Sequence, residues 1–258
     1  MKLKIACLQF DISFGNPAEN YQKAERFIKK ASDADVVILP ELWTTGYDLS
    51  RLDEIGDENG KYTKQWLSDI ARTYEVNIVA GSVAVKKNDG IYNTMYIVGK
   101  NGDMLSEYSK VHLFKLMDEH QYLAAGSKEN TFALEGIQAC GVICYDIRFP
   151  EWIRKHTENG ASLLFVSAEW PAPRLDHWKA LLIARAIENQ CFVAACNCSG
   201  SNPDNQFAGH SMIIDPWGKI IAEASDGEEI ISAELELGIS EKIRAQIPIF
   251  SDRRTELY

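Results

Sequence analysis

Residues 35–40 read Asp-Val-Val-Ile-Leu-Pro, and a glutamate, Glu41, follows them directly. This run is continuously apolar after its first residue and has the length of a β-strand. An apolar strand without alternation predicts burial on both faces, as in a sheet that lies between two other layers. The stretch therefore predicts an α/β fold and puts a carboxyl group at the end of a buried strand.

The alternation of strands and helices continues on both sides of this run. Residues 4–10 predict a strand. Asn16-Pro17-Ala18-Glu19 then predicts a helix start, with Asn16 as the N-cap. Further strands are expected over residues 77–85, 138–145, 161–168, 191–199, 210–216 and 230–237, and helices over residues 64–75, 150–155 and 176–190. Strands interleaved with helices indicate a layered α/β fold.

Residues 91–110 predict a β-hairpin, with Asn101-Gly102 as a two-residue turn. A hairpin implies antiparallel pairing, so we expect mixed sheets rather than purely parallel ones. The sequence has no low-complexity tract, long linker or shift in composition. We therefore expect a single domain over residues 1–258.

Charge and composition limit the class of protein. The formal net charge is −10, from 27 basic and 37 acidic residues. A dominant nucleic-acid surface is therefore not expected, although a local basic patch is not excluded. No apolar run approaches the roughly 20 residues of a membrane span, and the first residues lack the pattern of a signal peptide. The six cysteines lie mostly in apolar runs, which favours a reducing cytoplasm.

Three reactive residues occur where apolar strands end: Glu41, Lys110 and Cys144. Functional groups in α/β proteins gather at such positions because the strands hold the loops in register. Each residue also has a purely structural interpretation, as a loop carboxylate, a solvated lysine or a buried thiol. Residue type and spacing alone leave both interpretations open.

Together the three side chains could hydrolyse an amide. A thiol needs a base or a nearby cation to become a nucleophile, and Glu41 and Lys110 could fill these roles. Lys110 and a backbone N–H at the Cys144–Tyr145 turn could stabilise the oxyanion, where one donor is worth about 3 kcal/mol. A thioester on Cys144 would then be hydrolysed with Glu41 as the base.

Other catalytic and binding sites are less well supported. The five histidines carry no cysteine-protease pattern, and Cys196-x-Cys198 lacks the spacing and the second pair of a zinc site. No phosphate-binding G-x-x-x-x-G-K-[ST] string occurs. A non-catalytic binding or regulatory protein with the same fold remains an alternative of another class.

The strings LPELWTTGY around Glu41, YSKVHLF around Lys110 and GVICYDIRFPEW around Cys144 resemble the three signature blocks of the nitrilase superfamily of carbon–nitrogen hydrolases. They occur in the family's order. HWKALLIARAIENQCFVAACN and GHSMIIDPWGKIIAEA are also similar to family blocks. The resemblance extends from residue 5 to about residue 248 and covers nearly the whole chain.

This resemblance implies a four-layer α-β-β-α sandwich, no metal, no organic cofactor and a homodimer formed through helices near the nucleophile. It assigns Glu41 as general base, Lys110 as oxyanion stabiliser and Cys144 as nucleophile. Many members have a second active-site glutamate, and Glu119 in DEHQYLAAG occupies the similar position. The alternative for Glu119 is a loop acid beside Asp118.

Within the superfamily the chain looks like the omega-amidases, which hydrolyse monoamides of short dicarboxylates such as 2-oxoglutaramate and succinamate. A substrate carboxylate requires a cation, and a guanidinium suits it. Nitrilase and N-carbamoyl amino acid hydrolase activities are the alternatives with the same triad. The expected substrate-binding residues are Tyr145, Arg148, Trp170 and Arg174, where Arg148 could instead form a structural ion pair with Glu151 or Asp146 and Trp170 could be plain core.

Overall fold

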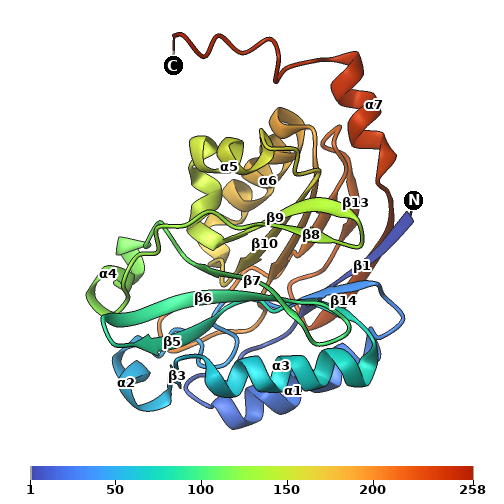
Figure 1. Ribbon diagram of the computed structural model, residues 1–258. Helices are drawn as coiled ribbons and strands as arrows, with labels where there is room; N and C mark the ends of the chain where they lie inside the picture. Colours follow the sequence, from blue (N-terminus) through green and yellow to red (C-terminus); the bar gives the residue numbers. More distant parts are fainter. Residues whose placement is uncertain (1, 258) are drawn as a thin grey trace.

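The computed structural model describes residues 2–257, which form four layers of secondary structure (Figure 1). Two β-sheets face each other in the middle. Helices α1 (Pro17–Lys30) and α3 (Lys61–Tyr74) cover the outer face of the first sheet, and α5 (Pro150–Thr157) and α6 (Leu175–Asn189) cover that of the second. The predicted α-β-β-α sandwich is confirmed. The end residues of the predicted 1–258 domain lie outside the described part.

The first sheet has eight strands among the described residues, in the order β14-β1-β2-β4-β6-β5-β3, and β7 also pairs with β6. β1, β2 and β4 run parallel, whereas β14 and β6 pair with their neighbours in antiparallel fashion. The strands are β1 (Lys2–Gln9), β2 (Val36–Ile38), β3 (Asp57–Glu58), β4 (Asn77–Val79), β5 (Val83–Lys87), β6 (Gly90–Val98), β7 (Met104–Ser109) and β14 (Glu229–Glu236).

The second sheet has six strands within residues 2–257, in the order β13-β12-β11-β10-β9-β8. Its central three strands are parallel and its outer strands antiparallel, so both sheets are mixed, as predicted. The strands are β8 (Thr131–Leu134), β9 (Ile137–Ile143), β10 (Leu163–Ala168), β11 (Phe192–Asn197), β12 (Met212–Ile214) and β13 (Ile220–Glu223).

The sequence did not predict β8, β13, two one-turn helices or the last helix. The one-turn helices are α2 (Leu52–Ile55) and α4 (Glu119–Tyr122), and the last is α7 (Gly238–Gln246). In Figure 1 the chain after α7 extends away from the layers. None of the helices between residues 2 and 257 is both long and apolar enough to cross a bilayer.

Strand β2 contributes to two hydrophobic cores. Val36 and Ile38 face the core between the sheets, while Val37, together with Leu39 just after the strand, faces the core under α1 and α3. All four side chains are fully buried. The continuous apolar run therefore predicted burial on both faces correctly, because alternate side chains of a strand point to opposite faces.

The prediction of one strand over residues 77–85 was wrong, because Gly81 interrupts it between β4 and β5. Gly81 has a φ of 57°, and a Cβ atom there would lie 1.8 Å from the carbonyl oxygen of Pro40. Only glycine allows this conformation and this contact together. The chain at Gly81 therefore passes directly against the segment that carries Glu41.

The predicted hairpin forms, but its turn is longer than two residues. β6 and β7 are joined by residues 99–103, where the Gly102 N–H donates to the Gly99 carbonyl at 2.7 Å. The Gly99 N–H donates to the Asp103 carbonyl at 2.9 Å, so the turn itself consists of residues 100–102. Gly102 has a φ of 85°, and a three-residue hairpin turn needs a left-handed residue at this position. The predicted N-cap is confirmed, since the Asn16 side chain accepts from the Glu19 N–H at 3.3 Å.

Candidate active site

Glu41 begins the loop after β2 and is fully buried. The segment around Gly81 fixes this loop. The Ser82 N–H donates to the Pro40 carbonyl at 3.1 Å, and the Ser82 hydroxyl accepts from the Leu42 N–H at 2.9 Å. Two neighbouring strand ends thus hold the backbone on both sides of Glu41, which limits where its carboxylate can lie.

The Lys110 ammonium lies between two buried carboxylates. Its Nζ donates to Glu41 Oε1 at 2.7 Å and to Glu119 Oε1 at 2.6 Å. All three side chains are inaccessible to solvent. The Lys110 N–H also donates to the Asn93 carbonyl at 2.8 Å, so the pairing of β7 with β6 positions this lysine. The structure brings together the glutamate and lysine predicted from distant parts of the sequence.

Both carboxylates have all of their oxygens engaged. Glu41 accepts from Lys110, from the Asn93 side-chain amide at 2.8 Å and from the Glu169 N–H at 2.9 Å. Glu119 accepts from Lys110, from the Tyr47 hydroxyl at 2.7 Å and from the Phe114 N–H at 2.9 Å. Three hydrogen bonds to each group therefore fix both carboxylates in place beside Lys110.

Charge and burial act in opposite directions on the Lys110 ammonium. Burial by itself lowers the pKa of Lys110, but the carboxylates of Glu119 and Glu41 raise this pKa well above its ordinary value. Burial raises the pKa of Glu119, and the charge of Lys110 opposes that rise. Lys110 therefore stays a cation, and its charge is available to an anion that forms nearby.

Cys144 sits at a backbone turn between β9 and a 3-10 helix over Cys144–Arg148. Its φ of 45° is rare for a residue with a side chain, which is a feature often found at functional sites. The predicted strand over 138–145 ends at Ile143 because the helix begins here. The first N–H groups of a helix have no partner within the helix, so they can donate to a bound group.

A buried carboxylate, Asp146, fixes this turn. It accepts from the Ile143 N–H at 3.0 Å and from the Tyr108 hydroxyl at 2.7 Å. It also accepts from the His112 N–H at 3.1 Å and contacts the His112 ring at 2.8 Å. Because Tyr108 and His112 flank Lys110, Asp146 ties the cysteine turn to the segment that carries the lysine.

The Cys144 thiol is held in its neutral form at rest. Burial, followed by the charge of Glu41, raises the pKa of Cys144 well above its ordinary value, and Lys110 only partly offsets this rise. Such a thiol reacts only if a base removes its proton as it attacks, and Glu41 is the neighbouring carboxylate whose charge acts most strongly on it.

A narrow cavity of about 10 Å³ opens onto Cys144. This volume is about that of one water molecule, so a larger ligand requires the lining side chains to move apart. The four predicted substrate-binding residues all line it, together with two apolar residues that the sequence analysis missed and one proline. The lining residues besides Cys144 are Phe114, Met117, Tyr145, Arg148, Trp170, Pro171 and Arg174.

Two arginines in this cavity lack an acidic partner. Among residues 2–257 no carboxylate lies within ion-pair distance of Arg148 or Arg174. Arg148 instead lies over the Trp170 ring, 4.8 Å from its centre, and Arg174 lies 5.3 Å from the centre of the Phe114 ring. The expected alternative of an ion pair between Arg148 and Glu151 or Asp146 does not occur in the described part of the chain.

Trp170 lines the cavity and also belongs to the hydrophobic core between the sheets. Its indole N–H donates to the Arg174 carbonyl at 2.7 Å, and its ring packs against Trp178 at 5.4 Å between centres. The side chain is 2% exposed. Trp170 therefore supports both arginines, one through its ring and the other through its N–H.

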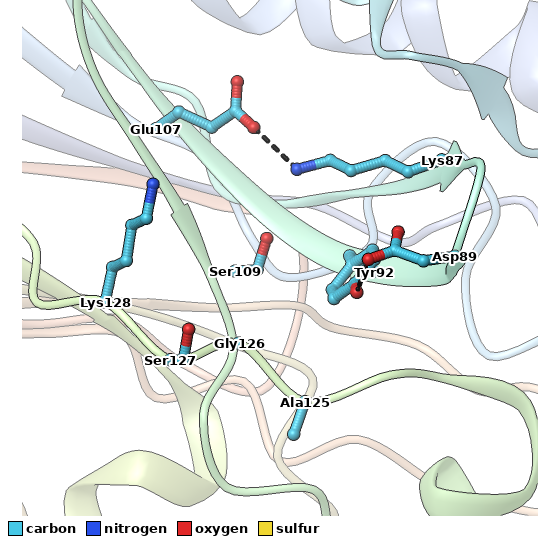
Figure 2. A pocket seen from close by; sticks show the side chains of 9 residues that line it. All are labelled: Lys87, Asp89, Tyr92, Glu107, Ser109, Ala125, Gly126, Ser127 and Lys128. Carbon is cyan, nitrogen blue, oxygen red and sulfur yellow. Dashed lines mark hydrogen bonds and ion pairs between the residues drawn. The ribbon is translucent and has the colours of Figure 1, made fainter.

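A larger polar hollow of about 520 Å³ lies elsewhere, beside β5, β6 and β7 (Figure 2). It contains none of the predicted site residues. Lys87 pairs with Glu107 at 2.9 Å, and the Tyr92 hydroxyl donates to Asp89 at 3.0 Å. Because these charged and polar groups already have partners, the smaller cavity at Cys144 is the better candidate for chemistry.

The buried group of Glu41, Lys110 and Glu119 forms a charged centre. Three residues that contact it were not predicted from the sequence: Tyr47, Asn93 and Glu169. Glu169 could have been found, because it follows an apolar strand just as Glu41 does. Tyr47 lies within the LPELWTTGY block. Asn93 is a polar residue inside an otherwise apolar strand, which is a weaker indication. The catalytic and binding roles of the predicted residues stay predictions.

A match to a known protein family identifies the class to which this protein belongs. Residues 4–245 match the carbon–nitrogen hydrolase family. The chain belongs to this family, and it is an enzyme. The predictions of a nitrilase-superfamily member and of an amide-cleaving carbon–nitrogen hydrolase are confirmed.

Individual relatives are similar over their full length. The chain is 64% identical to a 2-oxoglutaramate amidase of Bacillus subtilis (strain 168), covering 100% of both chains. Its structure resembles that of Saccharomyces cerevisiae Nit3, a member of branch 10 of the nitrilase superfamily, with a TM-score of 0.91 at 32% identity and 98% and 97% of the two chains covered. An Escherichia coli (strain K12) protein named omega-amidase YafV is 34% identical, over 97% of this chain and 96% of that protein.

Proposed function

We propose that this enzyme hydrolyses the terminal amide of short dicarboxylic monoamides, such as 2-oxoglutaramate and succinamate, through Cys144, Glu41 and Lys110. The observation that carries the choice of substrate is the pair of guanidinium groups, on Arg148 and Arg174, that line the Cys144 cavity with no acidic partner among residues 2–257. The name of the Bacillus subtilis relative supports the same substrate class.

In the first half of the reaction Cys144 attacks the amide carbon. As the sulfur–carbon bond forms, the thiol proton passes to Glu41 and the carbonyl electrons move onto oxygen. The Lys110 ammonium and an N–H at the Cys144–Tyr145 turn stabilise this oxyanion. The carbon–nitrogen bond then breaks, Glu41 gives the proton to the nitrogen, and ammonia leaves a thioester on Cys144.

In the second half water hydrolyses the thioester. Glu41 takes a proton from water as its oxygen attacks the carbonyl carbon, and Lys110 stabilises the second oxyanion. The carbon–sulfur bond breaks, the acid product leaves, and the proton on Glu41 returns to sulfur. Glu119 orients Lys110 throughout, because both of its oxygens are held by hydrogen bonds.

The substrate carboxylate binds at the opposite end of the cavity from the reacting amide. Burial lowers the pKa of Arg148, which reflects an unfavourable desolvation of its charge. A carboxylate compensates this cost and accepts two parallel hydrogen bonds from one guanidinium. Because both arginines line the same cavity as Cys144, the site favours monoamides in which a short chain separates the carboxylate from the amide.

A panel of substrates tests this proposal. Ammonia release should be fastest with 2-oxoglutaramate and succinamate, and slower with neutral amides of equal length. Faster turnover of a nitrile or of an N-carbamoyl amino acid would instead assign one of those activities. A folded protein that releases no ammonia from any compound in the panel would contradict catalysis and favour a binding role.

We further propose a single domain over residues 1–258, a homodimer and a location in the cytoplasm. Ile187 on α6 is 51% exposed and Trp217 is 52% exposed, and Gly218 packs against Ile183 and Ile187. This apolar surface supports a dimer through the helical layer. The six cysteines are free thiols, which suits a reducing compartment. Sedimentation of Ile187→Glu, with Tyr62→Glu on α3 as control, tests the dimer.

A further inference from the structure

Glu169 is a third buried carboxyl group beside the charged centre. It follows β10 directly, is 1% exposed, and donates its backbone N–H to Glu41 Oε2 at 2.9 Å. Its side chain differs from those of Glu41 and Glu119 in one respect. Each of those groups accepts three hydrogen bonds, whereas Oε1 of Glu169 is buried without any partner among the described residues.

The charges around Glu169 also favour the neutral form of its side chain. Within residues 2–257, Lys110 is the one ammonium that contacts Glu41 and Glu119, and it pairs with both of these carboxylates. A third negative charge in the same dry region would have no compensating cation. An ionised carboxylate that is buried without a donor or a cation is far costlier than a neutral one. The charged groups that act on Glu169 are Glu41, Lys110, Asp11 and Glu119. Glu169 in turn acts on the neighbouring Tyr47 and Cys198.

We propose that Glu169 keeps its proton in the resting enzyme and serves as a positioning residue, a neutral carboxyl group that anchors Glu41 through its backbone. This inference rests on the proposed role of Glu41 as the base. The direction of the Glu169 pKa, which burial and then the charge of Glu41 raise well above its ordinary value, agrees with it.

The neutral state matters for the chemistry because the reaction adds negative charge to this region. The oxyanion forms next to Lys110 while Glu41 and Glu119 are close by. A further negative charge on Glu169 would repel the oxyanion in a region of low dielectric, where such repulsion is strong. Ionisation of Glu169 should therefore slow the reaction, and the enzyme should lose activity at high pH as this proton leaves.

Infrared difference spectroscopy tests the protonation state without any turnover. At neutral pH, Glu169→Gln should lose one carbonyl band of a protonated carboxyl group relative to the unmodified enzyme. Glu41→Gln, which makes the same chemical change on the neighbouring group, should lose none. An unchanged band in Glu169→Gln, or its loss in Glu41→Gln, would overturn the inference whether or not the proposed substrates are hydrolysed.

The pH profile of ammonia release tests the catalytic consequence. Glu169→Gln cannot ionise, so its activity at high pH should persist at least about one pH unit further than that of the unmodified enzyme. Near neutral pH its kcat should fall by no more than about tenfold, because the charge of the site is preserved. Identical alkaline limbs in the two proteins would contradict the proposed effect of Glu169 on the reaction.

Discussion

The Tyr47 hydroxyl donates to Glu119 Oε1 at 2.7 Å, and both side chains are buried. Glu119 Oε1 is also the oxygen that accepts from Lys110. Tyr47 therefore acts on the lysine indirectly, by fixing the carboxylate that holds it. Burial, followed by the charge of Glu119, raises the pKa of Tyr47 well above its ordinary value, so the hydroxyl remains a donor.

Replacing this donor should weaken catalysis. In Tyr47→Phe the buried Glu119 loses one of its three donors, at a cost of about 1–3 kcal/mol, and kcat should fall by about tenfold or more. Tyr96→Phe is the matched control, because the buried Tyr96 hydroxyl has no hydrogen-bond partner in the described chain. Equal kcat values for the two variants would remove Tyr47 from the support of Lys110.

Cys144 should be the thiol on which turnover depends. Cys144→Ala and Cys144→Ser should both lower kcat by about a thousandfold or more while the circular dichroism spectrum stays unchanged. Iodoacetamide should modify Cys144 before Cys140, because Cys144 opens onto the cavity, whereas Cys140 is fully enclosed. Preferential labelling of Cys140, detected by mass spectrometry, would count against this assignment.

The two arginines should control the choice of substrate. Arg174→Ala and Arg148→Ala should each reduce kcat/KM for 2-oxoglutaramate by about 10- to 100-fold, since a hydrogen bond to a charged group contributes about 1.5–3 kcal/mol. The effect on a neutral amide of equal length should be smaller. Arg72→Ala, at an exposed Arg72–Asp69 pair, serves as the control. Equal losses on charged and neutral amides would place the substrate carboxylate elsewhere.

Gly81 should be essential to the fold around Glu41. Gly81→Ala combines an unfavourable φ of 57° with a clash against the Pro40 carbonyl, so it should lower the free energy of unfolding by about 3 kcal/mol or more. Gly136→Ala has a similarly unfavourable φ of 80° but open space around the new methyl group. It should cost only about 1 kcal/mol in urea unfolding. Similar losses in both variants would mean that the contact with Pro40 is unimportant.

The pH dependence of stability should report the proton on Glu169. The pKa of Glu169 is raised in the folded protein well above its ordinary value, so the folded state binds this proton more tightly than the unfolded state does. This contribution to stability is complete below the unfolded pKa and is lost as pH rises toward the folded pKa. Glu169→Gln avoids the loss.

The difference in free energy of unfolding between Glu169→Gln and the unmodified protein should therefore move in favour of the variant as pH rises from about 4 to 8. Urea unfolding at several pH values measures it, with the exposed Glu151→Gln as the control. A difference that stays constant across this range would show that Glu169 binds its proton equally in both states.

Local patterns in the sequence predicted most of the helices and strands. They also singled out Glu41, Lys110 and Cys144 at the ends of apolar strands. The apolar run before Glu41 predicted a strand buried on both faces, and Asn16 predicted a helix start, because both features depend on residues close in sequence. The order of the Glu41, Lys110 and Cys144 blocks indicated the family, and with it the four layers.

The tertiary structure alone decided which groups contact one another. Gly81 breaks a predicted strand because Pro40, 41 residues earlier in the chain, passes against it. Arg148 has no acidic partner in the described part of the chain, because Asp146 binds Tyr108 and His112 instead. Whether a carboxyl group such as Glu169 is ionised depends on the donors and cations that folding brings to it. These contacts join residues far apart in the chain, and no local pattern encodes their distances.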